Sequence, residues 1–191
     1  MAGVESITGG SVDIRGAAPL DADEMRAAVS GVGESVRRFV FGMCGDWHVA
    51  EDLAQESLLK AWRSRASFDG RANVRTWVFA IARNTWLDYL RRRRVRGVEE
   101  TMDQATATVS KVPGPFASAS RREFSTQMES ALTRLTSEQR EALAMRESGG
   151  LTFPQIARLL ELPVSTVKSR VRYALMKLAD ELRAFAPEQT S

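Results

Sequence analysis

The sequence predicts an all-α protein made of two small helical domains joined by a flexible linker, the second domain containing a helix-turn-helix. Apolar residues recur at the spacing of amphipathic helices in residues 21–96 and again in residues 123–187. Residues 97–122 lose that pattern and combine acids, threonines, serines and a Pro-Gly-Pro, which is typical of a linker. Residues 1–20 are rich in small residues and lack apolar periodicity, so we expect a flexible tail.

Glycines divide the first domain into three or four predicted helices. The helical pattern is interrupted at Gly31 and Gly33, then at Gly42 and Gly45, and finally at the turn 68–70. Glycine is unfavourable in the interior of a helix and is common where a helix ends. No part of the sequence carries a β-strand signal that outweighs the helical one.

Capping patterns mark the helices of the second domain. Thr136 and Thr152 are each followed three residues later by glutamine, which is the capping-box spacing. The sequence then predicts a short helix near 152–160, a break of about three residues, and a longer helix over 165–183 with Ser165 as its N-cap. Two helices so spaced form a helix-turn-helix.

The charges are clustered far more than the net charge suggests. The 191 residues are 43% hydrophobic and 27% charged, as in soluble folded domains, and the formal net charge is only +3. Eight arginines and one acid occupy residues 71–96, whereas residues 46–56 contain four acids and no lysine or arginine. A basic surface and a separate acidic surface indicate two different partners.

Several classes of function find no support in the sequence. One cysteine, Cys44, and one histidine, His48, cannot form an internal disulfide or a Cys/His zinc site, and we expect both to be structural. No phosphate loop or carboxylate cluster suggests an enzyme, a cofactor or a metal. No apolar stretch approaches the roughly 20 residues of a membrane span, and no secretion signal is recognisable. We therefore expect a cytoplasmic, non-enzymatic protein without membrane insertion.

The last predicted helix has one apolar side and one polar side. At about 100° per residue, six apolar residues fall within one sector: Val167, Val171, Ala174, Leu175, Leu178 and Leu182. A recognition helix anchors such a side in its domain and presents polar residues to DNA. The candidate DNA contacts are Ser165, Thr166, Lys168, Ser169, Arg170, Arg172 and Tyr173. The alternative is an ordinary surface helix with a solvated basic face.

Two stretches of the second domain carry its most distinctive pattern: LTFPQIARLLELPVSTVKSRVRYALMKL and the preceding LTSEQREALAMRESGG. Together they resemble region 4 of sigma factors, the module that binds the −35 promoter element. Members of this family often have glycine in the turn, where this chain has Glu161. A left-handed backbone at Glu161 would cost roughly 1 kcal/mol, so the turn is expected to be altered or strained.

The first domain resembles sigma region 2, and with region 4 it identifies the chain as similar to extracytoplasmic-function (ECF) sigma factors of the sigma-70 family. The distinctive stretches are AEDLAQESLLKAW and TWVFAIARNTWLDYLRRRR. Asp52, Gln55, Glu56 and Leu59 occupy i, i+3, i+4 and i+7 of a helix, an acidic face with a leucine within it. The resemblance implies that this face binds core RNA polymerase; alone, it could be an ordinary acidic helix face.

The second of these stretches is expected to bind the opened −10 element. An amide and an aromatic ring between arginines suit an unpaired strand, because bases stack and pair while phosphates attract positive charge. The resemblance implies capture of a flipped base by the residues from Phe68 to Arg75 and by Asn84. The candidate −10 contacts are Phe68, Arg71, Asn73, Arg75, Trp77, Asn84, Asp88 and Arg91. Trp77 could instead be a core residue, and the arginines at 91–94 a solubilising helix end.

The predicted function is that of a sigma factor, which binds core RNA polymerase and directs promoter recognition and opening. The partners are then core RNA polymerase, promoter DNA and, by family resemblance, an anti-sigma factor. The alternative is a free-standing helix-turn-helix transcription regulator, which binds duplex DNA without polymerase.

Overall fold

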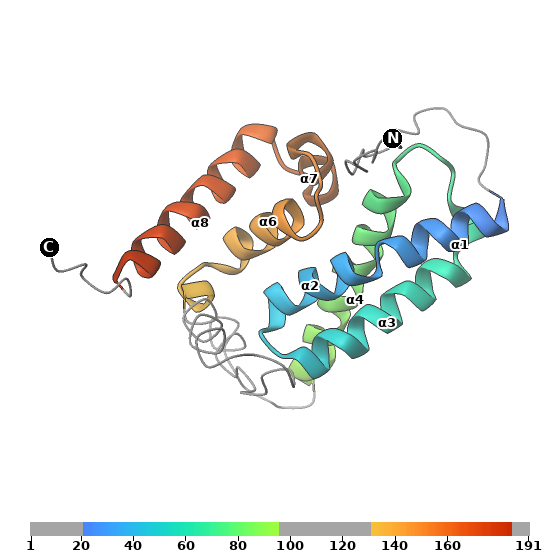
Figure 1. Ribbon diagram of the computed structural model, residues 1–191, viewed down its shortest axis with the longest axis horizontal. Helices are drawn as coiled ribbons and strands as arrows, with labels where there is room; N and C mark the ends of the chain where they lie inside the picture. The colour runs from blue at the N-terminus through green and yellow to red at the C-terminus, as the bar shows by residue number, and fades with distance from the viewer. Residues whose placement is uncertain (1–20, 96–130, 185–191) are drawn as a thin grey trace, which may run out of the picture.

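The computed structural model describes residues 21–95 and 131–184, and all regular elements within them are helical. The predicted tail, 1–20, and the predicted linker, 97–122, lie outside these residues. Figure 1 shows two groups of helices, which we call the N-terminal group (21–95) and the C-terminal group (131–184). The helices are α1 (Ala22–Gly31), α2 (Gly33–Cys44), α3 (Trp47–Arg63), the short 3-10 helix η1 (Arg65–Ser67), α4 (Val74–Val95), α6 (Ser137–Glu147), α7 (Phe153–Leu160) and α8 (Val164–Ala184).

The N-terminal group is built around α3, which contacts α1, α2 and α4. Its core contains Phe39 of α2 and Phe79 of α4, both fully buried, with ring centroids 5.4 Å apart. Helix α2 ends at Gly45, whose φ of 68° is left-handed. The predicted break at Gly45 is therefore confirmed, whereas the one at Gly42 is wrong, because Gly42 lies inside α2.

The C-terminal group begins its helices where the capping patterns predict. Thr136 and Thr152 both form complete capping boxes with the glutamines that follow them. Helix α8 begins at Val164, so the prediction of Ser165 as its N-cap is wrong. The carbonyl of Pro163 already accepts hydrogen bonds from the N–H groups of Thr166 and Val167, which starts the helix earlier.

The apolar side of α8 is largely as predicted. Val167, Val171, Ala174 and Leu178 are buried against the domain. Leu175 was placed in the same sector, but it is 47% exposed, so this prediction is wrong. It lies at the edge of the sector, where the short helices α6 and α7 do not cover it.

The two groups pack against each other, which the sequence did not indicate. Helix α2 contacts α6, and α4 contacts α7, so the C-terminal group lies beside α2 and α4 (Figure 1). One cluster of buried residues runs through both groups, from Phe39 and Phe79 to Met145 and Ile156. A second, smaller cluster lies within the C-terminal group and includes Leu135 and Leu143.

Candidate polymerase-binding and DNA-binding surfaces

The candidate polymerase-binding residues form one face of α3, which we call the acidic face: Asp52, Gln55, Glu56 and Leu59. Asp52, Gln55 and Leu59 are exposed, and Leu59 retains 47% of its surface. The opposite side of α3 is buried as predicted, through Ala50, Leu53, Ala54, Ser57 and Ala61. An exposed leucine among polar groups fits a protein-binding face, and it also occurs on ordinary solvated faces, so polymerase binding by this face stays a prediction.

Glu56 has two cationic partners within the chain. Its carboxylate lies 2.7 Å from Lys60 Nζ and 3.5 Å from Arg92 of α4. The hydrogen bond from Lys60 is the main reason that the pKa of Glu56 lies below its usual value. Lys60 also donates to Thr85 of α4 at 3.2 Å. The acidic face and the arginine run therefore meet at Glu56, and the expectation of two separate surfaces is wrong at this point.

A shallow cavity of about 250 Å³ marks the place where these two surfaces meet. Its walls come from α3 and the last turns of α4. The lining residues are Val49, Asp52, Leu53, Glu56, Tyr89, Arg92 and Arg93.

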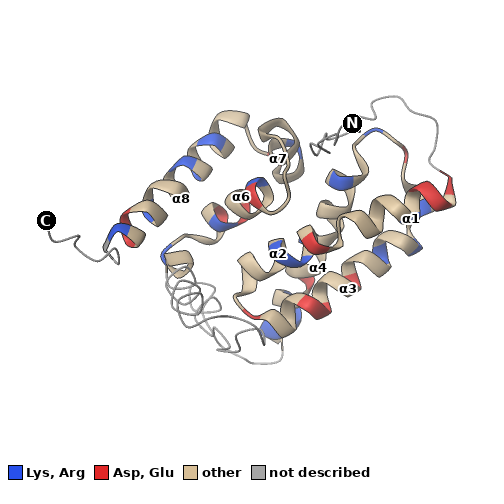
Figure 2. Ribbon diagram, in the orientation of Figure 1, with Lys and Arg blue, Asp and Glu red and all other residues tan. Residues whose placement is uncertain are grey.

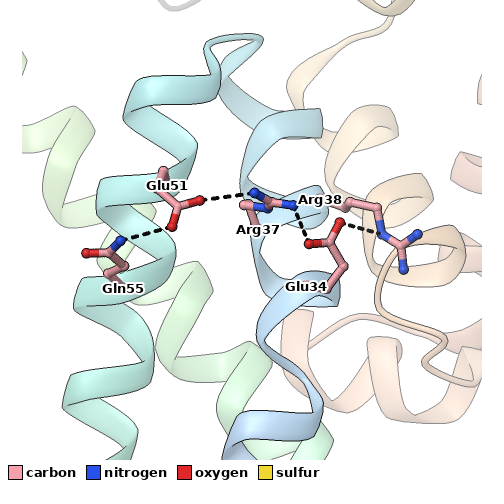
Figure 3. Close-up of polar contacts among 5 residues, drawn as sticks. All are labelled: Glu34, Arg37, Arg38, Glu51 and Gln55. Carbon is pink, nitrogen blue, oxygen red and sulfur yellow. Dashed lines mark hydrogen bonds and ion pairs between the residues drawn. The ribbon is translucent and has the colours of Figure 1, made fainter. Parts of the chain in front are cut away.

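Gln55 belongs to a polar network that joins α3 to α2 (Figure 3). Its amide donates to Glu51 at 2.9 Å, and this bond is the main reason that the pKa of Glu51 is lowered. Arg37 of α2 pairs with both Glu51 and Glu34, and Glu34 also lies 4.0 Å from Arg38. Arg37–Glu51 is the contact of this network that joins the two helices, and its side chains are 40% and 45% exposed, so it adds little to the apolar packing of α3 against α2.

The candidate −10 residues lie on the loop before α4 and along α4 itself. Trp77, Asn84, Asp88 and Arg91 are spaced by 7, 4 and 3 residues, which places them in one stripe of the helix. Asn84 is exposed, and Asp88 pairs with Arg91 at 3.1 Å. An exposed amide followed by arginines can pair with a base and with phosphates.

The aromatic members of this set are more buried than a stacking platform requires. The rings of Phe68 and Trp77 lie 5.2 Å apart, and both side chains are half-buried against the core of the N-terminal group. Arg71, in the loop between Phe68 and α4, is exposed and lies 3.3 Å from Asp69. Asn73 accepts a hydrogen bond from the Arg75 N–H at 2.8 Å, which caps the start of α4.

Arg75 is engaged with both groups of helices. Its Nη2 donates to Ser35 Oγ at 2.8 Å, and its Nε donates to the carbonyl of Gly149 in the C-terminal group. Burial lowers the pKa of its guanidinium. In this conformation the guanidinium of Arg75 is engaged by Ser35 and Gly149, and its contact with the −10 element stays a prediction.

The candidate −35 residues lie on the outer side of α8, as predicted. Ser165, Lys168, Ser169, Arg172 and Tyr173 are exposed, and Thr166 and Arg170 are half-buried. The guanidinium of Arg172 lies 5.2 Å from the centroid of the Tyr173 ring. Figure 2 shows basic residues repeating along α8. This arrangement suits a helix inserted into a DNA groove.

Two residues that join the groups were not predicted from the sequence. Arg83 of α4 pairs with Glu141 of α6 at 2.8 Å, across 58 residues of sequence. The sequence holds one local signal for a contact on this side of α4, which is the four-residue spacing of Arg75, Phe79 and Arg83. Residues so spaced share one face of a helix.

In residues 21–95 and 131–184, no helix is long and apolar enough to cross a membrane. The same residues contain no cluster of histidine, cysteine and carboxylate side chains that could hold a metal ion. Cys44 is buried, and burial raises the pKa of its thiol to about 11.

Comparison with known proteins gives matches over both groups. Sigma-70 region 2 matches residues 29–96, and Sigma-70 region 4 matches residues 125–178. The chain is 33% identical to the ECF RNA polymerase sigma factor EcfG of Rhodopseudomonas palustris, over 88% of this chain and 93% of that protein. It is 32% identical to the ECF RNA polymerase sigma factor SigL of Mycobacterium tuberculosis, over 86% and 92% of the two chains.

Two solved structures have a similar fold. The sigma factor RpoE from Bartonella quintana, in complex with the anti-sigma factor NepR, is 25% identical, with a TM-score of 0.65 over 83% of this chain and 96% of that one. CnrH, in complex with the cytosolic domain of CnrY, gives a TM-score of 0.56 at 25% identity, over 83% and 86% of the two chains. Two sigma regions in the family's order, with relatives that match nearly end to end, show that the chain belongs to the ECF sigma factors of the sigma-70 family.

Proposed function

We propose that this protein binds core RNA polymerase and directs it to a promoter, which it recognises at two elements and opens at one. The observation that carries the proposal is the presence of regions 2 and 4, in that order, in a chain that matches ECF sigma factors over most of its length. A free-standing regulator needs the helix-turn-helix alone and leaves region 2 without a role.

In this proposal the acidic face of α3 binds the polymerase. Asp52 and Leu59 are exposed, and the opposite side of α3 is packed into the core of the N-terminal group, which orients the helix. A rigid face binds at a smaller entropic cost than a mobile one. Glu56 would exchange its intramolecular partners, Lys60 and Arg92, for groups of the polymerase.

The stripe of α4 that contains Asn84 is proposed to hold the opened strand of the −10 element. Extruding a base costs a few kcal/mol, and contacts to the extruded base offset that cost without any chemical step. The proposed function is therefore non-enzymatic. The outer side of α8 is proposed to read the −35 element, with Arg172 as a candidate base contact.

Two further parts of the proposal concern a regulatory partner and the location of the protein. The solved relative RpoE is in complex with the anti-sigma factor NepR. We propose that this protein, too, is held inactive by an anti-sigma factor. A protein that acts on RNA polymerase works where the chromosome is, so we propose a cytoplasmic location.

Charge reversal of the acidic face tests the proposal. Replacing Asp52 and Glu56 together by lysine is expected to weaken binding to purified core polymerase about tenfold or more, which corresponds to about 1.4 kcal/mol. The fold should survive, because surface ion pairs such as Glu56–Lys60 contribute about 0–1 kcal/mol each.

The matched control reverses Asp23 and Glu147, two exposed carboxylates on other helices, and so changes the net charge equally. Circular dichroism checks that both variants fold. Equal affinity of the acidic-face variant and the control for core polymerase would refute the assignment of this face.

A further inference from the structure

Trp47, the first residue of α3, keeps 36% of its surface exposed. Within residues 21–95 two other large apolar side chains are exposed, Leu59 on the same helix and Val95 at the end of the described range. The other large apolar residues of the N-terminal group are buried or half-buried. Two of the three exposed ones therefore lie on α3, the helix that carries the acidic face.

The Trp47 ring is held in place by two residues of α2. It stacks on Phe41, with ring centroids 4.0 Å apart and an angle of 15° between the planes. The guanidinium of Arg37 lies 5.5 Å from its centroid. Such stacking and cation–π contacts restrict the ring and leave part of it accessible. A side chain that is already ordered loses little conformational entropy when a partner covers it.

A continuous surface joins Trp47 to the acidic face. Trp47, Glu51 and Gln55 follow one another at intervals of four residues, so they lie along one side of α3. Arg37, which lies over the Trp47 ring, also pairs with Glu51. Glu51 accepts a hydrogen bond from Gln55 of the acidic face (Figure 3). The exposed part of Trp47 and the acidic face are thus parts of one surface.

This surface has the size of a single protein interface. Trp47 and Leu59 are 12 residues apart in the sequence, which is about 18 Å along the helix axis. An interface of standard size covers about 800 Å² of each partner, a patch about 30 Å across. Tryptophan and arginine are enriched where the binding energy of an interface is concentrated, and surrounding groups exclude water from them. Trp47 beside Arg37, bordered by polar side chains, has this composition.

Building on the proposed binding of core polymerase, we infer that Trp47 is an anchor residue of that interface. Its exposed edge enters an apolar hollow of the polymerase, while Asp52 of the acidic face pairs with a cationic group beside that hollow. Asp52 suits this role, because it has no ion-pair partner among the described residues. The interface then combines an apolar contact with a charged one, and the two can be measured separately.

Truncation of the ring tests the inference. Trp47→Ala should weaken binding to purified core polymerase about tenfold or more, because an anchor loses its apolar contacts. Trp47→Phe keeps an aromatic ring against Phe41 and should weaken binding about threefold or less. Val95→Ala shortens the third exposed apolar side chain of the group and should bind like the wild type. Circular dichroism and thermal unfolding show whether each variant is folded.

Salt separates the contact of Trp47 from that of the acidic face. Ions screen pairs of exposed charges but not apolar contacts. The ratio of the affinities of the wild type and Trp47→Ala should therefore be the same at about 0.1 M and about 0.4 M salt, whereas the ratio for the variant reversed at Asp52 and Glu56 should shrink several-fold. If the Trp47→Ala ratio shrinks to the same extent, the ring acts only by placing charged groups, and the inference is overturned.

A second measurement needs no variant. Oxidation of Trp47 by hydroxyl radicals in the wild type, quantified by mass spectrometry of its peptide, should fall several-fold when core polymerase binds and covers the ring. An added reporter peptide checks that the radical dose is the same with and without polymerase. Equal oxidation of Trp47 in the two samples would overturn the inference, even if Trp47→Ala does not fold.

The outcomes separate the inference from the proposed function. Wild-type affinity of folded Trp47→Ala, together with weaker binding of the variant reversed at Asp52 and Glu56, would overturn the inference and leave the proposed function intact. A loss of stability without a loss of affinity would do the same, because the ring would then only close the junction of α2 and α3. Failure of the wild type itself to bind core polymerase would overturn the proposed function, and the inference with it.

Discussion

Replacing Glu161 by glycine is expected to stabilise the protein, although it removes a side chain. Glu161 ends α7 with φ 56° and ψ 42°, and it is the one non-glycine residue with positive φ in the described residues. The chain is held there by the Leu162 N–H, which donates to the Ala157 carbonyl at 2.9 Å. Glycine is the usual residue at this position because it has no Cβ to oppose the left-handed backbone.

The size of the effect follows from two opposing terms. A left-handed backbone costs an ordinary residue about 1–2 kcal/mol, and Glu161→Gly removes that cost. Glycine also has more conformational freedom in the unfolded chain, which lowers the free energy of unfolding by about 0.4–1 kcal/mol. The net gain in the free energy of unfolding is about 0.5–1 kcal/mol, or about 1–4 °C in Tm for a chain of this length.

Urea unfolding and thermal unfolding, both followed by circular dichroism, measure this gain. Glu161→Gln is the matched control, since it removes the charge but keeps the Cβ, and it should leave the stability within about 0.5 kcal/mol of the wild type. Arg158→Gly places the same residue within the helix, where it should cost about 1 kcal/mol. If Glu161→Gly destabilises the protein, or equals Glu161→Gln, the assignment of strain to this turn is wrong.

Three further predictions concern the proposed DNA contacts and the single thiol. Asn84→Ala should reduce promoter opening, measured by permanganate reactivity, about tenfold more than closed-complex formation in a gel shift; equal losses would count against base capture by Asn84. Arg172→Ala should cost about 1–3 kcal/mol at one position of the −35 element, and an unchanged sequence profile in a binding selection would remove it from the readout. Burial raises the pKa of Cys44 from 9.0 to about 11, so the folded state disfavours the thiolate. The stability of the wild type relative to Cys44→Ala should thus be constant below pH 9 and fall between pH 9 and pH 11, because the unfolded chain then releases its proton first. A relative stability that stays flat across that range would contradict the burial of this thiol.

Local signals in the sequence were enough to predict most of the helices. The capping boxes at Thr136 and Thr152 and the glycine at Gly45 each involve residues within one helical turn of each other, so spacing alone reveals them. Ser165 was wrongly placed as a cap, because the carbonyl of Pro163, two residues earlier, already accepts the first hydrogen bonds of α8.

Helical spacing was enough to predict the inward and outward sides of α3 correctly. Contacts between residues that lie far apart in the sequence could not be predicted from spacing. The bond between Arg75 and Gly149 joins residues 74 apart, and Arg83 and Glu141 are 58 apart. Nothing near Arg75 in the sequence distinguishes an arginine that binds DNA from one that binds another part of the same chain.

The most direct test of the account is run-off transcription with purified core polymerase, with and without this protein, on a library of upstream fragments from the host genome. The account predicts transcripts with defined start sites that require both the protein and the core enzyme. It would be contradicted if the purified protein bound specific duplex fragments on its own, while the start sites and yields of the polymerase stayed the same in its presence.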